Sequence, residues 1–112
     1  MKYRALNKLN EWIYANLEIG SQGVSLFKEE IMPETVTCSI NMLDGNEREI
    51  FVGDIVIAQR FKGVVRYNEN KARFEIYDDK FQIGIELKCN PYTKVLPESE
   101  IMGNIFENTL HF

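Results

Sequence analysis

The sequence has one histidine, two cysteines and three prolines in 112 residues, and it lacks any long apolar run. Its longest purely apolar stretch, residues 55–58 (IVIA), is far shorter than the roughly 20 residues that a membrane-spanning helix needs. The opening residues MKYRALNKLN contain no apolar core typical of a signal peptide. We therefore expect a cytoplasmic protein that does not associate with membranes.

The scarcity of cysteine and histidine argues against several kinds of site. Cys38 and Cys89 lie about fifty residues apart and no CxxC pair exists, whereas structural zinc needs four ligands in closely spaced pairs. In the cytoplasm both thiols are expected to be reduced and buried. His111 is the penultimate residue, where chain ends usually fray, so it is a poor catalytic base. Asp78 and Asp79 are more typical of a turn than of a metal site.

The phosphate-cradling sequences GxGxxG and GxxxxGK[ST] are also absent. Asp54 follows Gly53, and we interpret its carboxylate as an acceptor for backbone N–H groups of a tight turn rather than as a catalytic acid. With no catalytic set in view, the sequence predicts a protein that is not an enzyme and that holds neither cofactor nor metal.

The remaining composition is that of a folded domain, with 45% hydrophobic and 27% charged residues. We expect one domain over 1–112, with an N-terminal portion over 1–46 and a β-barrel portion over 47–112. Seven Phe and five Tyr are expected to fill its core. The net charge of −4 argues against nucleic-acid binding through the overall field, because phosphate contacts need concentrated Lys and Arg.

One stretch does concentrate basic and aromatic side chains. Within residues 60–74, only Glu69 opposes five cations, and three rings are interleaved with them. Such a mixture is typical of single-strand nucleic-acid binding. The competing interpretation, which we favour, is that alternation along the strands turns the rings inward and leaves the cations in water. The candidate nucleic-acid-binding residues are Arg60, Lys62, Arg66, Tyr67, Lys71 and Arg73.

From residue 50 onward the hydrophobic period is two, which predicts strands. We expect strands around Ile50–Val52, Ile55–Ile57, Gly63–Tyr67 and Ala72–Tyr77, with turns at 68–71 and 78–80. Phe81, Ile83, Ile85 and Leu87 then alternate with polar residues, which is typical of a half-buried antiparallel strand. Short strands joined by tight turns form a meander, and meanders commonly close into small barrels.

The first thirty residues leave two alternatives open. Leu6, Leu9, Ile13 and Leu17 recur at helical spacing, which favours a helix on pattern alone. The alternative is a hairpin with strands at Lys2–Leu6 and Trp12–Leu17 around the turn 7–10. Residues 19–27 are expected to form loop and short strand around two glycines. Pro33 limits any helix near Glu29 to about one turn.

Three separated blocks of the sequence resemble a known family. Residues 50–56 (IFVGDIV), 63–67 (GVVRY) and 101–108 (IMGNIFEN) are similar to the I-Y-E-G-D-I-V, G-V-V and V-I-G-N-I-Y-E-N-P stretches of the YopX family of phage and prophage proteins. The start, KYRALNK, is similar to that family's K-F-R-A-W-D-K opening. Thr109 stands where the family usually has Pro, and the turn at Asp44 is shorter than the family's.

The resemblance implies a mostly β fold, a small SH3-like antiparallel barrel with a β-rich or α+β N-terminal portion, in a phage or prophage of a bacterial host. It favours the hairpin over the helix for residues 2–17. It implies no activity, because the family's function is uncharacterised. We expect an accessory protein that acts through protein–protein binding, either as a homo-oligomer or with a host or phage protein. The alternative function is single-stranded nucleic-acid binding through residues 60–74.

Overall fold

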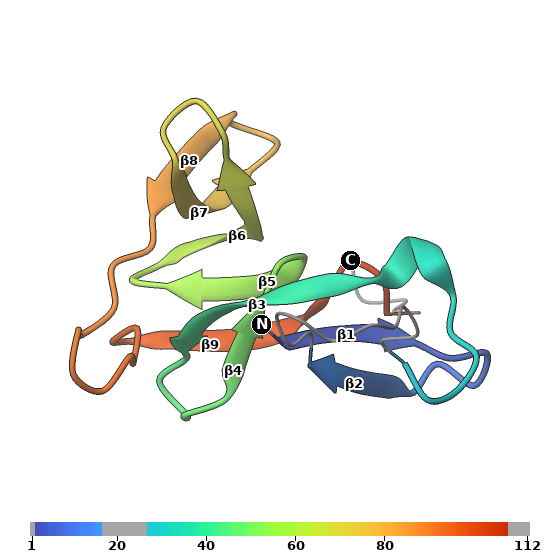
Figure 1. The fold of residues 1–112 in the computed structure, drawn as a ribbon. Coiled ribbons are helices and arrows are strands. Elements are labelled where there is room, and N and C mark those ends of the chain that lie inside the picture. Colours follow the sequence, from blue (N-terminus) through green and yellow to red (C-terminus); the bar gives the residue numbers. More distant parts are fainter. Residues whose placement is uncertain (1, 17–26, 108–112) are drawn as a thin grey trace. The chain divides into compact units, whose positions relative to one another are not determined.

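The computed structural model describes residues 2–16 and 27–107 (Figure 1). Its strands form two antiparallel sheets, one of four strands in the order β2-β1-β3-β4 and one of five in the order β8-β7-β6-β5-β9. The chain divides into two compact units, residues 1–39 with 106–112, and residues 40–105. The mostly β, antiparallel fold is confirmed. One domain over 1–112, with portions 1–46 and 47–112, stays a prediction.

The first unit contains a hairpin where the hydrophobic spacing favoured a helix. Strands β1 (Lys2–Leu6) and β2 (Trp12–Asn16) pair antiparallel, with Leu6 opposite Trp12. The Asn7 side chain accepts hydrogen bonds from the N–H groups of Leu9 (2.9 Å) and Glu11 (3.0 Å). These hydrogen bonds to the backbone stabilise a turn in place of a helix. The helix predicted from the hydrophobic spacing was therefore wrong, and the hairpin favoured by the family resemblance is confirmed over residues 2–16. Leu17 lies outside the described residues, as do residues 19–26 of the loop and short strand predicted over 19–27.

A short 3₁₀ helix, η1 (Pro33–Thr35), packs on this hairpin and fulfils the limit that Pro33 imposes. Leu6 donates its N–H to Thr35 Oγ1 (2.8 Å), and Met32 donates its N–H to the Leu6 carbonyl (2.7 Å). The beginning of strand β3 (Thr37–Leu43) pairs with β1 through Tyr3 opposite Cys38. The sequence did not predict β3.

The second unit contains the meander that the period of two predicted. The strands of this unit are β4 (Glu49–Phe51), β5 (Asp54–Ala58), β6 (Phe61–Asn68), β7 (Arg73–Asp78), β8 (Ile83–Glu86) and β9 (Ser99–Asn104). The sequence did not predict β9. Gly53, with φ +92°, makes the turn between β4 and β5. Asp54 Oδ2 accepts the Phe51 N–H (2.8 Å), which confirms the predicted role of this carboxylate.

Besides the buried Phe51 ring (1% exposed), the core of this unit is an aliphatic cluster. Its buried residues are Ile40, Ile50, Val56, Val65, Ile76, Leu87 and Leu96, with Phe61 and Phe74 packed half-buried against them. Phe81 and Tyr92 are instead 65% and 93% exposed. The expectation that rings fill the core was therefore wrong for much of the aromatic set. Cys38 and Cys89 are unbonded and half-buried, not fully buried as expected.

The five-stranded sheet is not closed into a barrel, which corrects that part of the predicted fold. Closure would require its edge strands β8 and β9 to pair with each other. The outer edge of β9 is already bonded to the turn between β3 and β4. Gly45 donates its N–H to the Ser99 carbonyl (2.8 Å), and Ile101 donates its N–H to Asp44 Oδ2 (3.0 Å).

Candidate functional site

The basic stretch does not form one continuous binding surface. Along β6, Lys62 and Arg66 lie on one face of the sheet and Tyr67 lies on the other, because successive residues of a strand point to opposite sides. Arg60 lies in the exposed turn between β5 and β6, and Lys71 in the exposed turn between β6 and β7. The structure therefore separates the candidate stacking ring from the arginine on the neighbouring position.

Tyr67 packs against its cross-strand neighbour Phe74, edge to face, with ring centroids 5.1 Å apart. Its ring is 48% exposed, so it is neither a core residue nor an open stacking platform. The prediction that alternation turns the rings inward holds for the half-buried Phe61 and Phe74 and fails for Tyr67.

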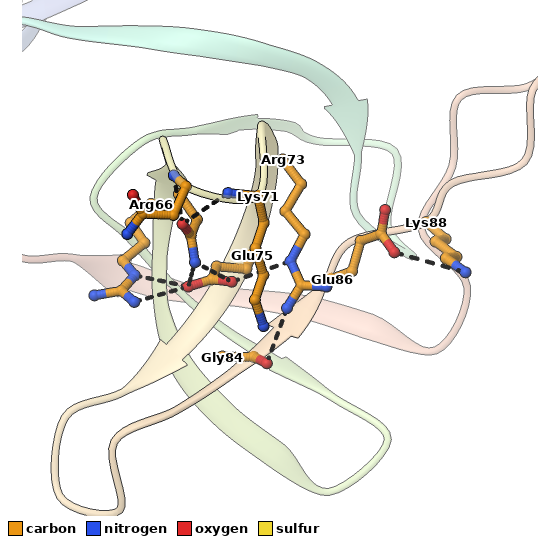
Figure 2. Close-up of polar contacts among 9 residues, drawn as sticks. Arg66, Lys71, Arg73, Glu75, Gly84, Glu86 and Lys88 are labelled. Atoms are coloured by element: carbon orange, nitrogen blue, oxygen red, sulfur yellow. Dashed lines mark hydrogen bonds and ion pairs between the residues drawn. The ribbon is translucent and has the colours of Figure 1, made fainter.

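Arg66 and Arg73 are bonded to a carboxylate that sequence reasoning missed. Figure 2 shows Glu75 between them, on the same face of the sheet. Arg66 contacts Glu75 Oε1 through Nε (2.9 Å) and Nη2 (2.8 Å), and Arg73 Nε donates to Oε2 (3.2 Å). Asn68 adds its side-chain amide at 3.3 Å. Arg66 and Arg73, two of the candidate nucleic-acid-binding residues, are therefore paired with a carboxylate of the protein itself.

Glu75 is 1% exposed although it carries a charge. Burial raises the pKa of this carboxyl. The hydrogen bonds from Arg66, Asn68 and Arg73 and the charge of Arg66 lower the pKa by more than burial raises it, so the pKa lies below its usual value. Arg66 also lies over the Tyr77 ring, with its guanidinium carbon 3.4 Å from the ring centroid. The cluster is a fixed structural network with one positive charge in excess.

Gly84 on β8 provides the room that Glu75 needs. A Cβ atom added at Gly84 would lie 2.5 Å from Glu75 Cδ. The Arg73 side chain extends from β7 to the neighbouring strand β8, where its Nη2 lies 3.4 Å from the Gly84 carbonyl oxygen (Figure 2). Glycine at this position is explained by the close approach of the carboxylate.

A second buried carboxylate, Asp44, closes the β9 edge of the sheet. It is fully buried, and its Oδ1 accepts the N–H groups of Asn46 and Arg48, both at 2.9 Å. Burial raises the pKa of Asp44, but the backbone bonds from Arg48, Ile101 and Asn46 and the Arg48 charge lower it below its usual value. Arg48 Nη2 also donates to the Ile101 carbonyl (2.6 Å).

The opposite edge of the same sheet is open and apolar. Among the described residues, no strand pairs with the outer side of β8. Phe81, Ile83 and Ile85 are 65%, 50% and 44% exposed, whereas Leu87 is 5% exposed. The predicted half-buried alternation is correct for Leu87 and wrong for the other three. Gln82 has φ +54°, so the strand begins only at Ile83.

An open cavity of about 290 Å³ lies beside this edge. Ile85 and Glu86 line it from β8, and Leu87 and Lys88 line it from the segment that follows. The other parts of the unit contribute Phe61, Ile76, Leu96 and Pro97, together with Ala58 and Gln59. The exposed apolar residues and the cavity form one surface, which we call the β8 surface and define as Phe81, Ile83 and Ile85 with the cavity next to them. The alternating pattern had pointed to these residues, but local sequence does not tell which end of a sheet is covered.

The remaining candidates form no chemical site. Asp78 Oδ1 accepts the Lys80 N–H (2.9 Å), as expected of a turn residue. Within residues 2–16 and 27–107, no group of three or more His, Cys, Asp or Glu side chains is placed to bind a metal ion. His111 lies outside the described residues. No helix in the described ranges has both the length and the hydropathy to cross a bilayer.

The fold and these sites define a small antiparallel β protein with one sealed and one open sheet edge. The family model described as YopX protein matches residues 2–110, so the chain belongs to the YopX family. This confirms the resemblance seen in the sequence. No curated protein matches the chain in the same way.

Proposed function

We propose that this YopX protein is a non-enzymatic, phage-type accessory protein that binds protein through the β8 surface. The observation that carries the proposal is the contrast between the two edges of one sheet. Asp44, Gly45 and Arg48 bond to the outer backbone groups of β9. The outer edge of β8 instead has three exposed apolar side chains beside it.

An unpaired sheet edge is a template for a further strand, and proteins usually protect it. The β9 edge is protected in this way. At the β8 edge, the described residues offer one such contact, from Arg73 Nη2 to the Gly84 carbonyl. Strand addition supplies affinity through main-chain hydrogen bonds and specificity through the alternate side chains. Ile83 and Ile85 are such alternate side chains, and the cavity beside Ile85 has room for an apolar group of the added strand.

The test compares Ile83→Lys with Tyr92→Lys, since Tyr92 is an exposed ring on a loop away from β8. Light scattering over a range of concentrations and affinity capture from host lysate provide the readouts. We expect the unmodified chain to form complexes, Ile83→Lys to lose them and Tyr92→Lys to keep them. A chain that stays monomeric and captures nothing, or two variants that both keep the complexes, would count against the proposal.

Single-stranded nucleic-acid binding is a second candidate, favoured by exposed Arg60, Lys62 and Lys71 and the partly exposed Tyr67 ring. The bonds from Arg66 and Arg73 to Glu75 weaken it, because both guanidinium groups are already paired with the same buried carboxylate. Labelled oligonucleotides at low and moderate salt test it. Binding that strengthens as salt falls and is lost in Lys62→Glu supports this function; no binding even at low salt rules it out.

A further inference from the structure

We infer that the partner strand at the β8 surface is β8 of a second copy of this chain, paired antiparallel so that Ile85 lies opposite Ile85. This inference rests on the proposed function and names the partner. It follows from three features of β8: the direction of its backbone groups, the exposed side chains on one face, and the charges on the other.

The backbone direction fixes which residues can pair outward. Leu87 donates its N–H to the Phe74 carbonyl (3.1 Å), so Leu87 faces β7 with its backbone groups. Backbone direction alternates along an antiparallel strand, so Ile85 and Ile83 also face β7. Gly84 and Glu86 therefore direct their N–H and C=O groups to the open edge.

In one two-fold register, the outward N–H and C=O groups of Gly84 and Glu86 on each copy bond to those of the other copy, and no residue outside β8 is needed. This register places Gly84 of each copy opposite Glu86 of the other, with Ile85 opposite Ile85 at the two-fold axis. Registers centred on Gly84 or on residue 83 would require outward bonds from Gln82, which lies in the left-handed region with φ +54°. A register centred on Glu86 would put two carboxylates directly opposite each other, which is unfavourable.

The apolar face is self-complementary in this register. Ile85 of one copy lies beside Ile85 of the other, and Ile83 lies beside Leu87. Ile83 and Ile85 are about half exposed in the single chain. Side-by-side packing of branched side chains on neighbouring strands stabilises a sheet and removes apolar surface from water.

The polar face is complementary as well. Arg73 Nη2 lies 3.4 Å from the Gly84 carbonyl, and Gly84 is the position opposite Glu86 of the second copy (Figure 2). Glu86 would thus approach the cluster of Arg66, Arg73 and Glu75, which has one positive charge in excess. In the single chain, Glu86 is an exposed side chain 3.6 Å from Lys88. Because the dimer is two-fold symmetric, this attraction between Glu86 and the cluster of the other copy occurs twice.

Disulfide trapping tests this register. In a background with Cys38→Ser and Cys89→Ser, Ile85→Cys is expected to form a disulfide-linked dimer on mild oxidation. Ile85 opposite Ile85 is a non-hydrogen-bonded pair, whose Cα atoms lie about 4.5 Å apart, and a disulfide can bridge that spacing. Ile83→Cys is the matched control. Its two copies would be offset by four residues, about 13 Å along the strand, and cannot bridge. Non-reducing gels of purified chains measure both.

Charge reversal gives a second, non-covalent readout. Glu86→Arg is expected to weaken dimerisation about tenfold in analytical ultracentrifugation, because two attractions become repulsions. Glu69→Arg, an exposed acid in the turn between β6 and β7, is expected to leave it unchanged.

The outcomes separate this inference from the proposed function. A disulfide at 85 and none at 83, together with the Glu86→Arg effect, supports self-pairing. Equal or absent trapping at both positions, or no effect of Glu86→Arg, overturns it. If self-pairing fails while capture of another protein still depends on Ile83, the proposed function stands with a different partner. If that dependence is absent too, both fail.

Discussion

At the scale of single residues, the buried carboxylate of Glu75 decides what the neighbouring arginines can do. Arg66 and Arg73 look like phosphate ligands in the sequence, but both donate to Glu75. Taking a carboxylate out of water is costly unless its lone pairs are satisfied, and five contacts from Arg66, Arg73 and Asn68 satisfy them. The guanidinium groups of Arg66 and Arg73 therefore stabilise the fold, and a phosphate would have to compete with Glu75 for them.

The variant Glu75→Gln tests this role. It keeps the shape of the side chain but leaves Arg66 and Arg73 without a buried anion. We expect it to lower the free energy of unfolding by about 1.5–3 kcal/mol, the usual range for a hydrogen bond to a charged group. Urea denaturation measures the change. Glu69→Gln, on an exposed turn, is the control and should change stability by less than about 0.5 kcal/mol; equal losses in both variants would contradict the role of Glu75.

At the scale of elements, turn chemistry explains several of the strand boundaries. Asn7, Asp44 and Asp78 each bond to backbone N–H groups two to four residues ahead, and each ends a strand or follows one. The turn between β5 and β6 is different, because Gln59 and Arg60 have φ values of 50° and 73° without glycine or asparagine. Two-residue hairpin turns of this kind favour Asn-Gly.

We expect Arg60→Gly to raise the free energy of unfolding by about 0.5 kcal/mol, because glycine adopts the left-handed region without the Cβ penalty. Arg60→Ala is the matched control, since it removes the same charge and keeps the strained backbone. A shift of the thermal midpoint upward for Arg60→Gly alone would show a backbone effect. A similar rise in both variants would instead assign the effect to the charge.

At the scale of the whole molecule, two buried carboxylates make stability depend on pH. The pKa values of Asp44 and Glu75 are lowered in the folded chain. The unfolded chain therefore binds protons more readily than the folded chain as the pH falls below about 5. The stability from these two groups is fully present above their unfolded pKa of about 4 and is lost as the pH falls through their folded pKa.

Denaturant titrations between about pH 7 and about pH 2 measure this dependence. We expect the free energy of unfolding to fall on acidification, and to fall less steeply in Glu75→Gln, which has lost one of the two titrating groups. Parallel curves for the unmodified chain and Glu75→Gln would mean that Glu75 does not contribute to the acid sensitivity.

The sequence by itself determined strands β4 to β8 of the second unit, the turns at 68–71 and 78–80, and the family, but not β9. Alternating side chains and turn-forming Asn, Asp and Gly act over a few residues, so their pattern can be read locally. The blocks at 50–56, 63–67 and 101–108 carried the family resemblance because they hold a conspicuous order of Gly, Asp and Asn. The role of Asp54 could also be predicted, since its partner Phe51 is a near neighbour.

Only the tertiary structure decided which surfaces are covered and which charges are paired. Arg66 and Glu75 meet through the register of β6 and β7, and Asp44 meets Ile101 across most of the unit's sequence. Phe81, Ile83 and Ile85 are exposed although they alternate with polar residues in the same pattern as the buried Leu87. Burial and charge pairing are properties of residues distant in sequence, and for that reason the open edge of β8 could not be distinguished from a core strand by its pattern.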